Sequence, residues 1–365
     1  METPIEYTAQ AASTFISGEV KIKIDEHGLS AAALFDTAVI PFAEVNGLIM
    51  ENNAVTVKAE GGDYVFSRMG NWCGPFYDAL YGAYNKAVLR AFFIKGAPLL
   101  SAYGAFHPVH VYENCVVSLP PDLSARRAPL CFAAGMEKGD YKLTLRTDDG
   151  ESYTYAKLGY DAEPFADAVE KQIRALREQT IGAVKEVDPT LSAAQASQIA
   201  KLMPMGVAAA IGEIAEIAPS FLAALEGKLA DTHAAWSYPI FKELCDPARI
   251  HIGFNPSFLW LTAPSPDGNF AAVEFSEEDM ATFIYRTGGD FTGFTKQLNR
   301  ALEAIDFRRE VIRLTDGELK KPENADYYMA AKRTASLKFI RSNFAGRVIH
   351  SNSEAWKRKL LESFK

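Results

Sequence analysis

The sequence YVFSRMG (residues 64–70), followed by NWCGPFYDAL (residues 71–80), decides how this chain is expected to fold. Alternating aromatic residues at the start of the stretch favour a half-buried strand, and Gly70 permits a tight turn at its end. Pro75 suits the first turn of a helix, where an N–H group has no partner to lose. Phe76 and Leu80 lie four residues apart and share one helix face. The stretch therefore predicts a strand, a turn and an amphipathic helix that packs on a sheet.

The same pattern returns at Gly159, which lies 89 residues after Gly70. Five positions of this second copy keep the same distance from the glycine, namely Tyr155, Lys157, Pro164, Phe165 and Asp167. A third, looser copy has Arg286 two residues before Gly288 but lacks the proline. Because similarity at a fixed spacing indicates repeated structural units, the sequence predicts tandem units that each end in a strand, a glycine turn and a helix.

The residues before the first helix alternate between apolar and polar side chains in six or seven short stretches. This alternation predicts an antiparallel meander over residues 19–66, covered by the helix at 75–93. Residues 1–17 lack the alternation and are expected to form a loose leader.

This order of strands and helix resembles the pleckstrin-homology-like (PH-like) fold, in particular its small bacterial and GRAM-type versions. The residues that carry the resemblance are the strand at 40–48, the acidic hairpin at 58–64, and the helix that begins with Pro75 and Phe76. In that family a bent antiparallel sheet forms an incomplete barrel, and a C-terminal helix plugs one open end. The resemblance implies an α+β protein built from tandem PH-like units.

A chain of 365 residues is too long for one ordinary core, so several domains are expected. An Ala-rich, helix-prone stretch separates the second and third copies of the pattern. The predicted parts are a first PH-like unit (1–106), a second unit (107–186), a helical insert (187–248), a third unit that is either complete or degenerate (249–310), and a basic, mostly helical tail (311–365).

The composition indicates a cytoplasmic protein. The first six residues lack the basic and apolar regions of a signal peptide, and the low-charge stretch 202–225 contains Glu213, Glu216 and Pro219. The four cysteines are widely spaced, which is typical of buried thiols in a reducing compartment. The tetrapeptide WCGP at 72–75 matches the start of a thioredoxin active site, but Phe76 replaces the second cysteine, so dithiol exchange cannot run.

No catalytic residue, metal ligand or cofactor is predicted. The sequence contains no phosphate-binding loop, no nucleophile elbow and no zinc-protease motif. His107 and His110 could be a metal pair, but Pro108 argues against the helix that would bring them together. Cys73 stands at a predicted helix N-terminus, where it is either an incidental thiol or one with a lowered pKa.

Two groups of cations are candidate binding residues. Arg68, Lys157 and Arg286 each precede a glycine turn by two residues, as exposed cations or as a repeated anion contact. Residues 332–365 carry nine Lys or Arg and two Glu, a charge of +7 that leaves −15 for the rest of a chain of net charge −8. The candidates within this tail are Lys332, Arg333, Lys338 and Arg341. The tail is expected to be a solvated helix, to dock on an acidic surface of the same protein, or to contact anionic lipid.

The leading functional hypothesis is a non-enzymatic binding or scaffold protein that uses its PH-like repeats for protein or peptide interaction. Peripheral membrane binding through the basic tail is an alternative, although the turn at 25–28 (DEHG) lacks the cations of phosphoinositide-binding members. A second alternative is an enzyme with a pocket between the helical insert and the third unit. Nucleic-acid binding is disfavoured because the chain is acidic overall.

Overall fold

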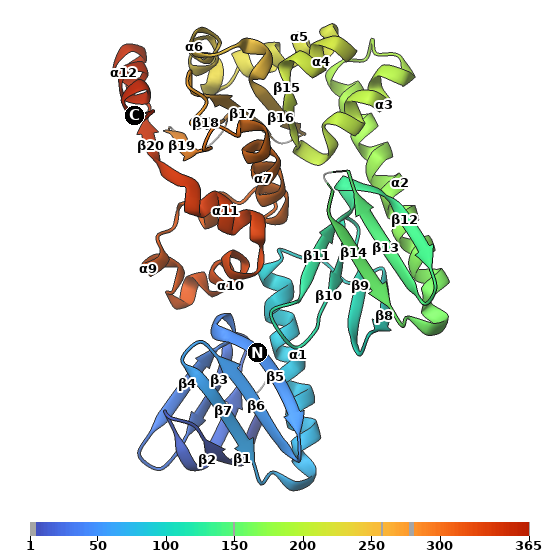
Figure 1. Cartoon of the computed structure of the whole chain (residues 1–365), viewed down its shortest axis with the longest axis vertical. Coiled ribbons are helices and arrows are strands. Elements are labelled where there is room, and N and C mark those ends of the chain that lie inside the picture. Colours follow the sequence, from blue (N-terminus) through green and yellow to red (C-terminus); the bar gives the residue numbers. More distant parts are fainter. Residues whose placement is uncertain (1–4, 149, 257, 277–280, 365) are drawn as a thin grey trace.

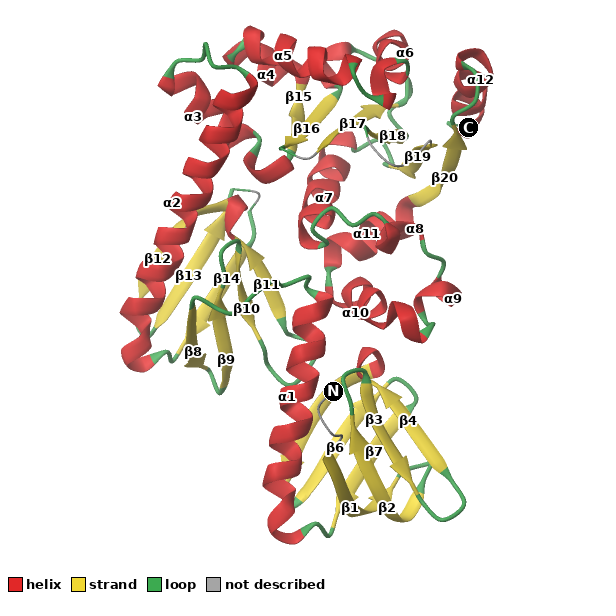
Figure 2. Ribbon diagram, turned by 180° about the vertical axis from the view of Figure 1, so that it is seen from behind, coloured by secondary structure: helices red, strands yellow, loops and turns green. Residues whose placement is uncertain are grey.

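The computed structural model describes residues 5–148, 150–256, 258–276 and 281–364. Within these residues the protein is a mixed α+β structure with four antiparallel sheets, all of them open (Figure 1). This confirms the α+β part of the predicted fold class, and the PH-like nature of the units stays a prediction. Figure 2 shows the two N-terminal sheet units below and beside a third sheet that is covered by helices.

The first unit is a seven-stranded sheet in the order β4-β3-β2-β1-β7-β6-β5, followed by one long helix. Its elements are β1 (Ile5–Ala12), β2 (Ser17–Ile24), β3 (Gly28–Ala32), β4 (Thr37–Pro41), β5 (Val45–Glu51), β6 (Ala54–Ala59), β7 (Gly62–Ser67) and α1 (Cys73–Ala91). The expected loose leader is wrong, because β1 pairs with both β2 and β7 in the middle of the sheet. Ala9 and Ala11 are its buried residues, and alanine carries little of the β-strand pattern that sequence reading relies on.

Helix α1 packs on this sheet through the face that the sequence predicted. Phe76 and Leu80 are fully buried, and the Phe76 ring lies edge-on to Phe66 with centroids 6.0 Å apart. The same ring lies 5.1 Å from that of Tyr7 on β1. The helix therefore packs on the first and the last strand of the unit, which are neighbours in the sheet.

The second unit has two smaller sheets and a longer helix. Its elements are β8 (Leu100–Gly104), β9 (His107–Val111), β10 (Cys115–Ser118), β11 (Arg126–Pro129), β12 (Ala133–Gly139), β13 (Lys142–Thr147), β14 (Ser152–Ala156) and α2 (Ala162–Val187). The expected boundary between residues 106 and 107 falls inside the β8–β9 hairpin, so the sheet of this unit begins at Leu100. Helix α2 buries Phe165 in this unit and Val184 in the core of the helical insert, which links the two parts.

The repeat seen in the sequence is also a repeat of backbone conformation. Arg68 and Lys157 both have positive φ, 60° and 58°, and Gly70 and Gly159 have φ of 55° and 59°. A short 3-10 turn follows each glycine and leads into the helix. Each unit also has a register shift at the start of its fifth strand, at Val45/Gly47 in the first and at Ala133/Gly135 in the second.

Replacing Gly70 or Gly159 by alanine is expected to destabilise its unit by about 1–2 kcal/mol, the cost of a left-handed conformation for an L-residue. An added Cβ atom would meet no described heavy atom within 4 Å at either position. The expected loss of stability therefore comes from backbone strain alone. Gly82, in the middle of α1, is the control, because Gly82→Ala should stabilise the helix by about 0.5–1 kcal/mol. Urea unfolding measures both signs, and an unchanged Gly70→Ala protein would contradict the expectation.

The third sheet has six strands in chain order, and its central strands are buried on both faces. Its strands are β15 (Ala208–Ala210), β16 (His251–Asn255), β17 (Phe258–Pro264), β18 (Phe270–Phe275), β19 (Ala281–Arg286) and β20 (Phe344–Ile349). The expected bounds 249–310 are too narrow, since β15 comes from the helical insert and β20 from the tail. Central strands covered on both faces lose the alternation that marks a half-buried strand, and this obscured the sheet in the sequence.

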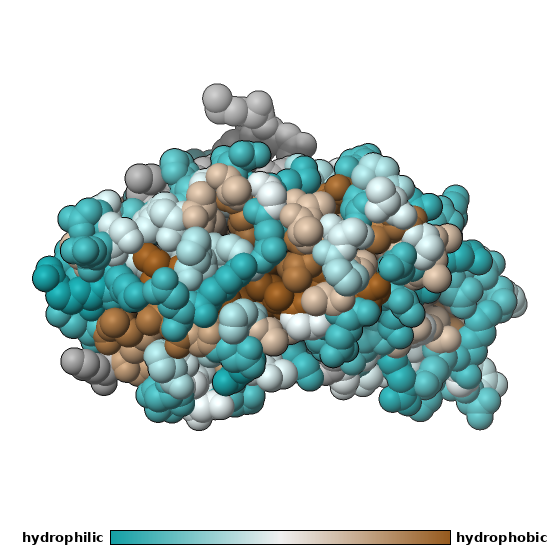
Figure 3. Space-filling model, turned by 90° about the horizontal axis from the view of Figure 1, so that it is seen from above, coloured by the Kyte–Doolittle hydropathy of each residue, from teal (hydrophilic) through white to brown (hydrophobic). Residues whose placement is uncertain are grey.

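Helices form the two layers around this sheet. Helices α7 (Phe291–Ala304) and α11 (Ala335–Asn343) share a core with one face, where Trp260 and Phe283 are buried. The other face is covered by α3 (Ala193–Leu202), α4 (Ile211–Ile217), α5 (Pro219–Ala230), α6 (Ser237–Leu244) and α12 (Ser353–Ser363). Figure 3 looks down on the helical layer, where apolar side chains reach the surface between polar ones. In the described part of the chain, no helix has the length and apolar character needed to cross a bilayer.

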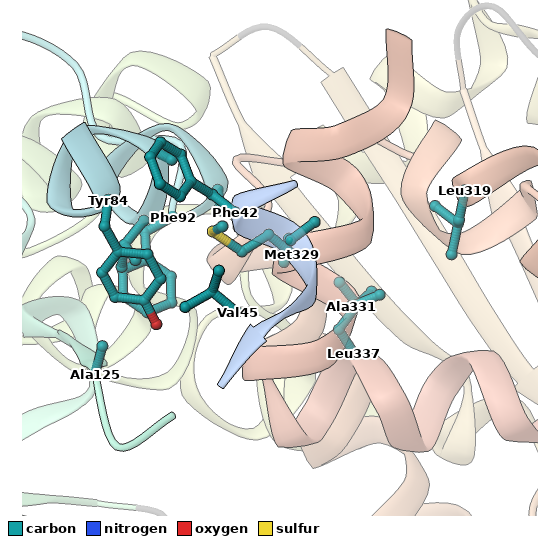
Figure 4. Close-up of a cluster of buried hydrophobic side chains, with 14 of the residues drawn as sticks. Phe42, Val45, Tyr84, Phe92, Ala125, Leu319, Met329, Ala331 and Leu337 are labelled. Carbon is teal, nitrogen blue, oxygen red and sulfur yellow. The ribbon is translucent and has the colours of Figure 1, made fainter. Parts of the chain in front are cut away.

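The tail is mostly helical, as predicted, and it packs against the rest of the protein. It contains α8 (Glu310–Arg313), α9 (Asp316–Leu319), α10 (Ala325–Arg333), α11, β20 and α12. Figure 4 shows Met329 of α10 beside Phe42 and Phe92 of the first unit, with Leu337 of α11 on the other side. Helix α10 therefore connects the first unit to the third sheet.

Candidate functional sites

The three repeated cations do not form one site. Arg68 follows β7, Lys157 follows β14, and Arg286 ends β19, and these strands belong to three separate sheets. All three residues are exposed. The positive φ shared by Arg68 and Lys157 shows that the repeat extends to the backbone conformation before each helix, and anion binding by the three cations stays a prediction.

Four exposed aromatic side chains lie on three turns next to Lys157, and we call them the aromatic patch: Tyr103, Phe106, Tyr141 and Tyr160. The backbone N–H of Lys157 donates to the Tyr141 carbonyl at 3.1 Å, and its Nζ lies 4.8 Å from the centroid of the Phe106 ring. The Tyr103 hydroxyl donates to the Phe106 carbonyl at 2.7 Å. Three turns thus bring these residues together at the lower end of the second unit in Figure 1.

The aromatic patch is not explained by folding. Its four side chains are 58%, 76%, 93% and 103% exposed, so they contribute little to a core. Phe106 and Tyr141 have φ of 70° and 55°, a region that favours glycine and asparagine. The first unit places Asn52 and Asn53 at the turn that corresponds to Tyr141. Strained, exposed aromatic residues at this turn therefore point to recognition of another molecule.

Three of the four tail cations bind groups of the same protein. Lys332 Nζ lies 2.8 Å from Glu60 Oε1 and donates to the Ala43 carbonyl at 2.8 Å. Arg333 donates to the Asp122 carbonyl at 3.1 Å and to the Tyr84 hydroxyl.

Arg341 is held in the same way within the tail. Its guanidinium donates to the carbonyls of Val311 and Leu314 and lies 2.8 Å from Asp316 Oδ1. Lys338 is exposed on α11. These contacts match the expectation that the basic tail docks on the protein itself, and they leave lipid binding by the tail as a prediction.

A cavity of about 430 Å³ lies between the helical insert and the third sheet, the place where the sequence hypothesis put an enzyme pocket. Its buried floor includes Ala208, Ala209 and Phe291. His251 lines it with its Nδ1 atom 3.0 Å from the Arg249 carbonyl, and burial lowers the pKa of this histidine. Among the described residues, the hydrogen bond recorded for the His251 ring is the one to the Arg249 carbonyl.

A second cavity, of about 450 Å³, marks the joint between the second unit and α7. Arg127 of β11 binds Glu303 of α7 through two hydrogen bonds of 2.5 and 2.7 Å, and each side chain is only 7% exposed. Arg300 of α7 lies 2.7 Å from Glu151 and stacks 5.4 Å from the Phe132 ring. Since these charges pair across the joint, they hold the two parts together.

A buried polar network links the last strands of the third sheet to α12. Glu274 lies 3.0 Å from His350 Nε2 and accepts a 2.6 Å hydrogen bond from Thr282, which in turn accepts one from Trp356 Nε1 at 2.9 Å. Burial raises the pKa of Glu274, while His350 opposes that shift. The side chains of Glu274 and His350 are 0% and 2% exposed, so the network is structural and offers no access to a substrate.

The remaining sequence candidates have local partners. His107 Nδ1 lies 3.2 Å from the Ala105 carbonyl, and His110 Nδ1 lies 2.9 Å from Ser101 Oγ. Across the residues that the structure describes, no three histidine, cysteine or acidic side chains gather as metal ligands. Cys73 is buried at the start of α1, and all four cysteines are free thiols.

No protein-family model matches the sequence, and no curated protein shows significant similarity to it. The assignment of function therefore depends on the geometry of the aromatic patch and of the two cavities.

Proposed function

We propose that the protein is a non-enzymatic interaction protein of the cytoplasm, built around two PH-like units, whose second unit binds a protein partner through the aromatic patch. The observation that carries this proposal is the exposure of Tyr103, Phe106, Tyr141 and Tyr160 around Lys157. Aromatic residues are enriched at the centres of protein–protein interfaces, where they bury large areas at a low cost in side-chain entropy.

The chemistry around the patch indicates what the partner offers. Lys157 supplies one cation beside the aromatic rings, and the exposed Asp140, Lys142 and Asp161 on the neighbouring turns together carry one negative charge. An apolar partner surface that carries a carboxylate opposite Lys157 would complement this arrangement. Such a contact would desolvate the aromatic rings and strengthen the ion pair with Lys157.

The tail cations support a structural role more than a membrane role. Lys332, Arg333 and Arg341 would have to release their contacts with Glu60, Tyr84 and Asp316 before they could bind lipid phosphates. Release of the Lys332 and Arg333 contacts would also expose the joint between α10 and the first unit. We therefore favour a protein partner over an anionic membrane.

Removing the aromatic patch is expected to abolish partner binding and leave the fold intact. The variant carries Tyr103→Ser, Phe106→Asn, Tyr141→Asn and Tyr160→Ser, all at exposed positions. Asparagine suits the left-handed turn positions, so the unfolding midpoint should stay the same or rise. Truncation of even one interface hot spot costs about 2 kcal/mol or more, so binding should weaken more than about thirtyfold.

The measurement is stoichiometric capture of a partner from lysate by the full-length protein, compared with this variant. The matched control is Leu34→Ser with Phe35→Asn, which removes two side chains, 84% and 90% exposed, from the first unit. A partner that binds the wild type and the control but not the patch variant supports the proposal. A partner retained by the patch variant would overturn it.

A further inference from the structure

The cavity between the helical insert and the third sheet has an apolar floor and a charged mouth. The floor is buried and consists mainly of Val207, Ala208, Ala209 and Phe291. Lys201, Arg249 and Lys296 line the same cavity and are exposed, together with Asp148 and Glu213. Three cations and two carboxylates therefore line the mouth of an apolar space of about 430 Å³.

The walls of this cavity are held in place without a ligand. The side-chain amide of Asn299 donates to the Ala208 carbonyl at 3.0 Å and accepts from the Ala208 N–H at 2.8 Å. It thereby occupies the free edge of β15 as a neighbouring strand would. The Thr295 hydroxyl donates to the Phe291 carbonyl, and His251 packs edge-on against the Phe291 ring at 5.3 Å. Small-molecule sites are usually preformed, apolar cavities of about 300–1,000 Å³ with a few fixed polar groups.

The cavity between the second unit and α7 differs from this one in the pairing of its charged side chains. There Arg127 and Arg300 face Glu303 and Glu151, so the charges satisfy one another. At the mouth of the apolar cavity, the structure records no ion pair for Lys201 or Lys296 among its described residues. The apolar cavity therefore combines a buried apolar floor with lysines that are available to an anion.

We propose that this cavity binds a small amphipathic anion, with an apolar body on the floor formed by β15 and α7 and one acidic group beside Lys201, Arg249 and Lys296. This site is separate from the aromatic patch and does not depend on the function proposed for it. Cys131 and Phe132 of the second unit also line the cavity, so a bound ligand would contact three parts of the protein at once. Binding should therefore raise the thermal stability of the full-length chain.

The test compares two fluorescent probes with the same rings. 1-Anilinonaphthalene-8-sulfonate carries an acidic group, and N-phenyl-1-naphthylamine lacks it. The full-length protein is expected to bind one equivalent of the sulfonate in a saturable way, about tenfold more tightly than the neutral probe. Lys201→Met with Lys296→Met should weaken the sulfonate about fivefold, because exposed ion pairs are each worth about 0.2–1 kcal/mol, and leave the neutral probe unchanged.

Two variants test whether the binding occurs in this cavity. Ala210→Phe fills it from the end of β15, and Thr292→Trp closes it from the exposed first turn of α7. Each should abolish saturable binding of both probes, and Thr292→Trp keeps the test valid if Ala210→Phe unfolds the protein. The matched charge control is Lys185→Met with Lys228→Met, two exposed lysines on α2 and α5. Equal affinity for the two probes, or full binding by the Thr292→Trp protein, would overturn the proposal.

Discussion

Replacing Arg127 by methionine is expected to lower the free energy of unfolding by about 3–5 kcal/mol, and replacing Glu303 by leucine should have a similar effect. Either change leaves the other charge buried without its partner. The two side chains are each 7% exposed and joined by two hydrogen bonds, so water can replace little of the lost interaction. Because the pair joins β11 to α7, the second unit should also separate more easily from the third sheet.

The double variant, Arg127→Met with Glu303→Leu, is the control that measures how much of the loss comes from leaving one buried charge without its partner. It removes both charges, and similar replacements of buried pairs are neutral or stabilising by about 1–4 kcal/mol. Urea unfolding of the four proteins gives the coupling between the two positions. If the double variant is as unstable as the sum of the single variants, the pair does not act as a buried unit.

Phe76→Ala and Phe165→Ala are each expected to cost about 3–5 kcal/mol, the usual penalty for truncating a buried phenylalanine. The two residues occupy the same place in the sequence repeat, and both are 0% exposed. Phe76 packs in the core of the first unit, whereas Phe165 packs in the core of the second, where it lies 5.1 Å from Tyr155. Two separate cores should therefore lose similar amounts of stability.

Amide hydrogen exchange shows which unit each substitution destabilises. Phe76→Ala should speed exchange in the first unit, and Phe165→Ala should speed it in the second. Asp78→Ala and Asp167→Ala are the matched controls, two residues further along the same helices and exposed in both. They should change stability by less than about 0.5 kcal/mol. If Phe76→Ala speeds exchange equally in both units, the repeats do not have independent cores.

The repeat could be read from the sequence because its signals are local. Gly159, Pro164 and Phe165 stand at fixed distances along the chain, and each has a conformational or packing preference of its own. The cap of α3 depends on a local signal of the same kind, because the Ser192 hydroxyl accepts from the Gln195 backbone N–H in a capping box.

The functional candidates could not be read from the sequence because they depend on distant contacts. Arg127 and Glu303 are 176 residues apart, and nothing in the neighbourhood of either predicts the other. Lys157 was recognised as a repeated cation, but its position between Phe106 and Tyr141 required the three-dimensional arrangement of three turns. One local signal was available, namely an aromatic residue after Asp140 in a tight hairpin, where asparagine or glycine is usual.

Site-specific photo-crosslinking tests the proposed interaction surface most directly. Benzoylphenylalanine would replace Tyr141 or Tyr160 in the patch, or Phe35 in the exposed turn between β3 and β4 of the first unit. We expect the same partner to crosslink from positions 141 and 160, to be absent from position 35, and to be lost when Lys157→Glu is added. An identical product from position 35, or patch crosslinks that are unchanged by Lys157→Glu, would contradict the assignment of the aromatic patch as the binding surface.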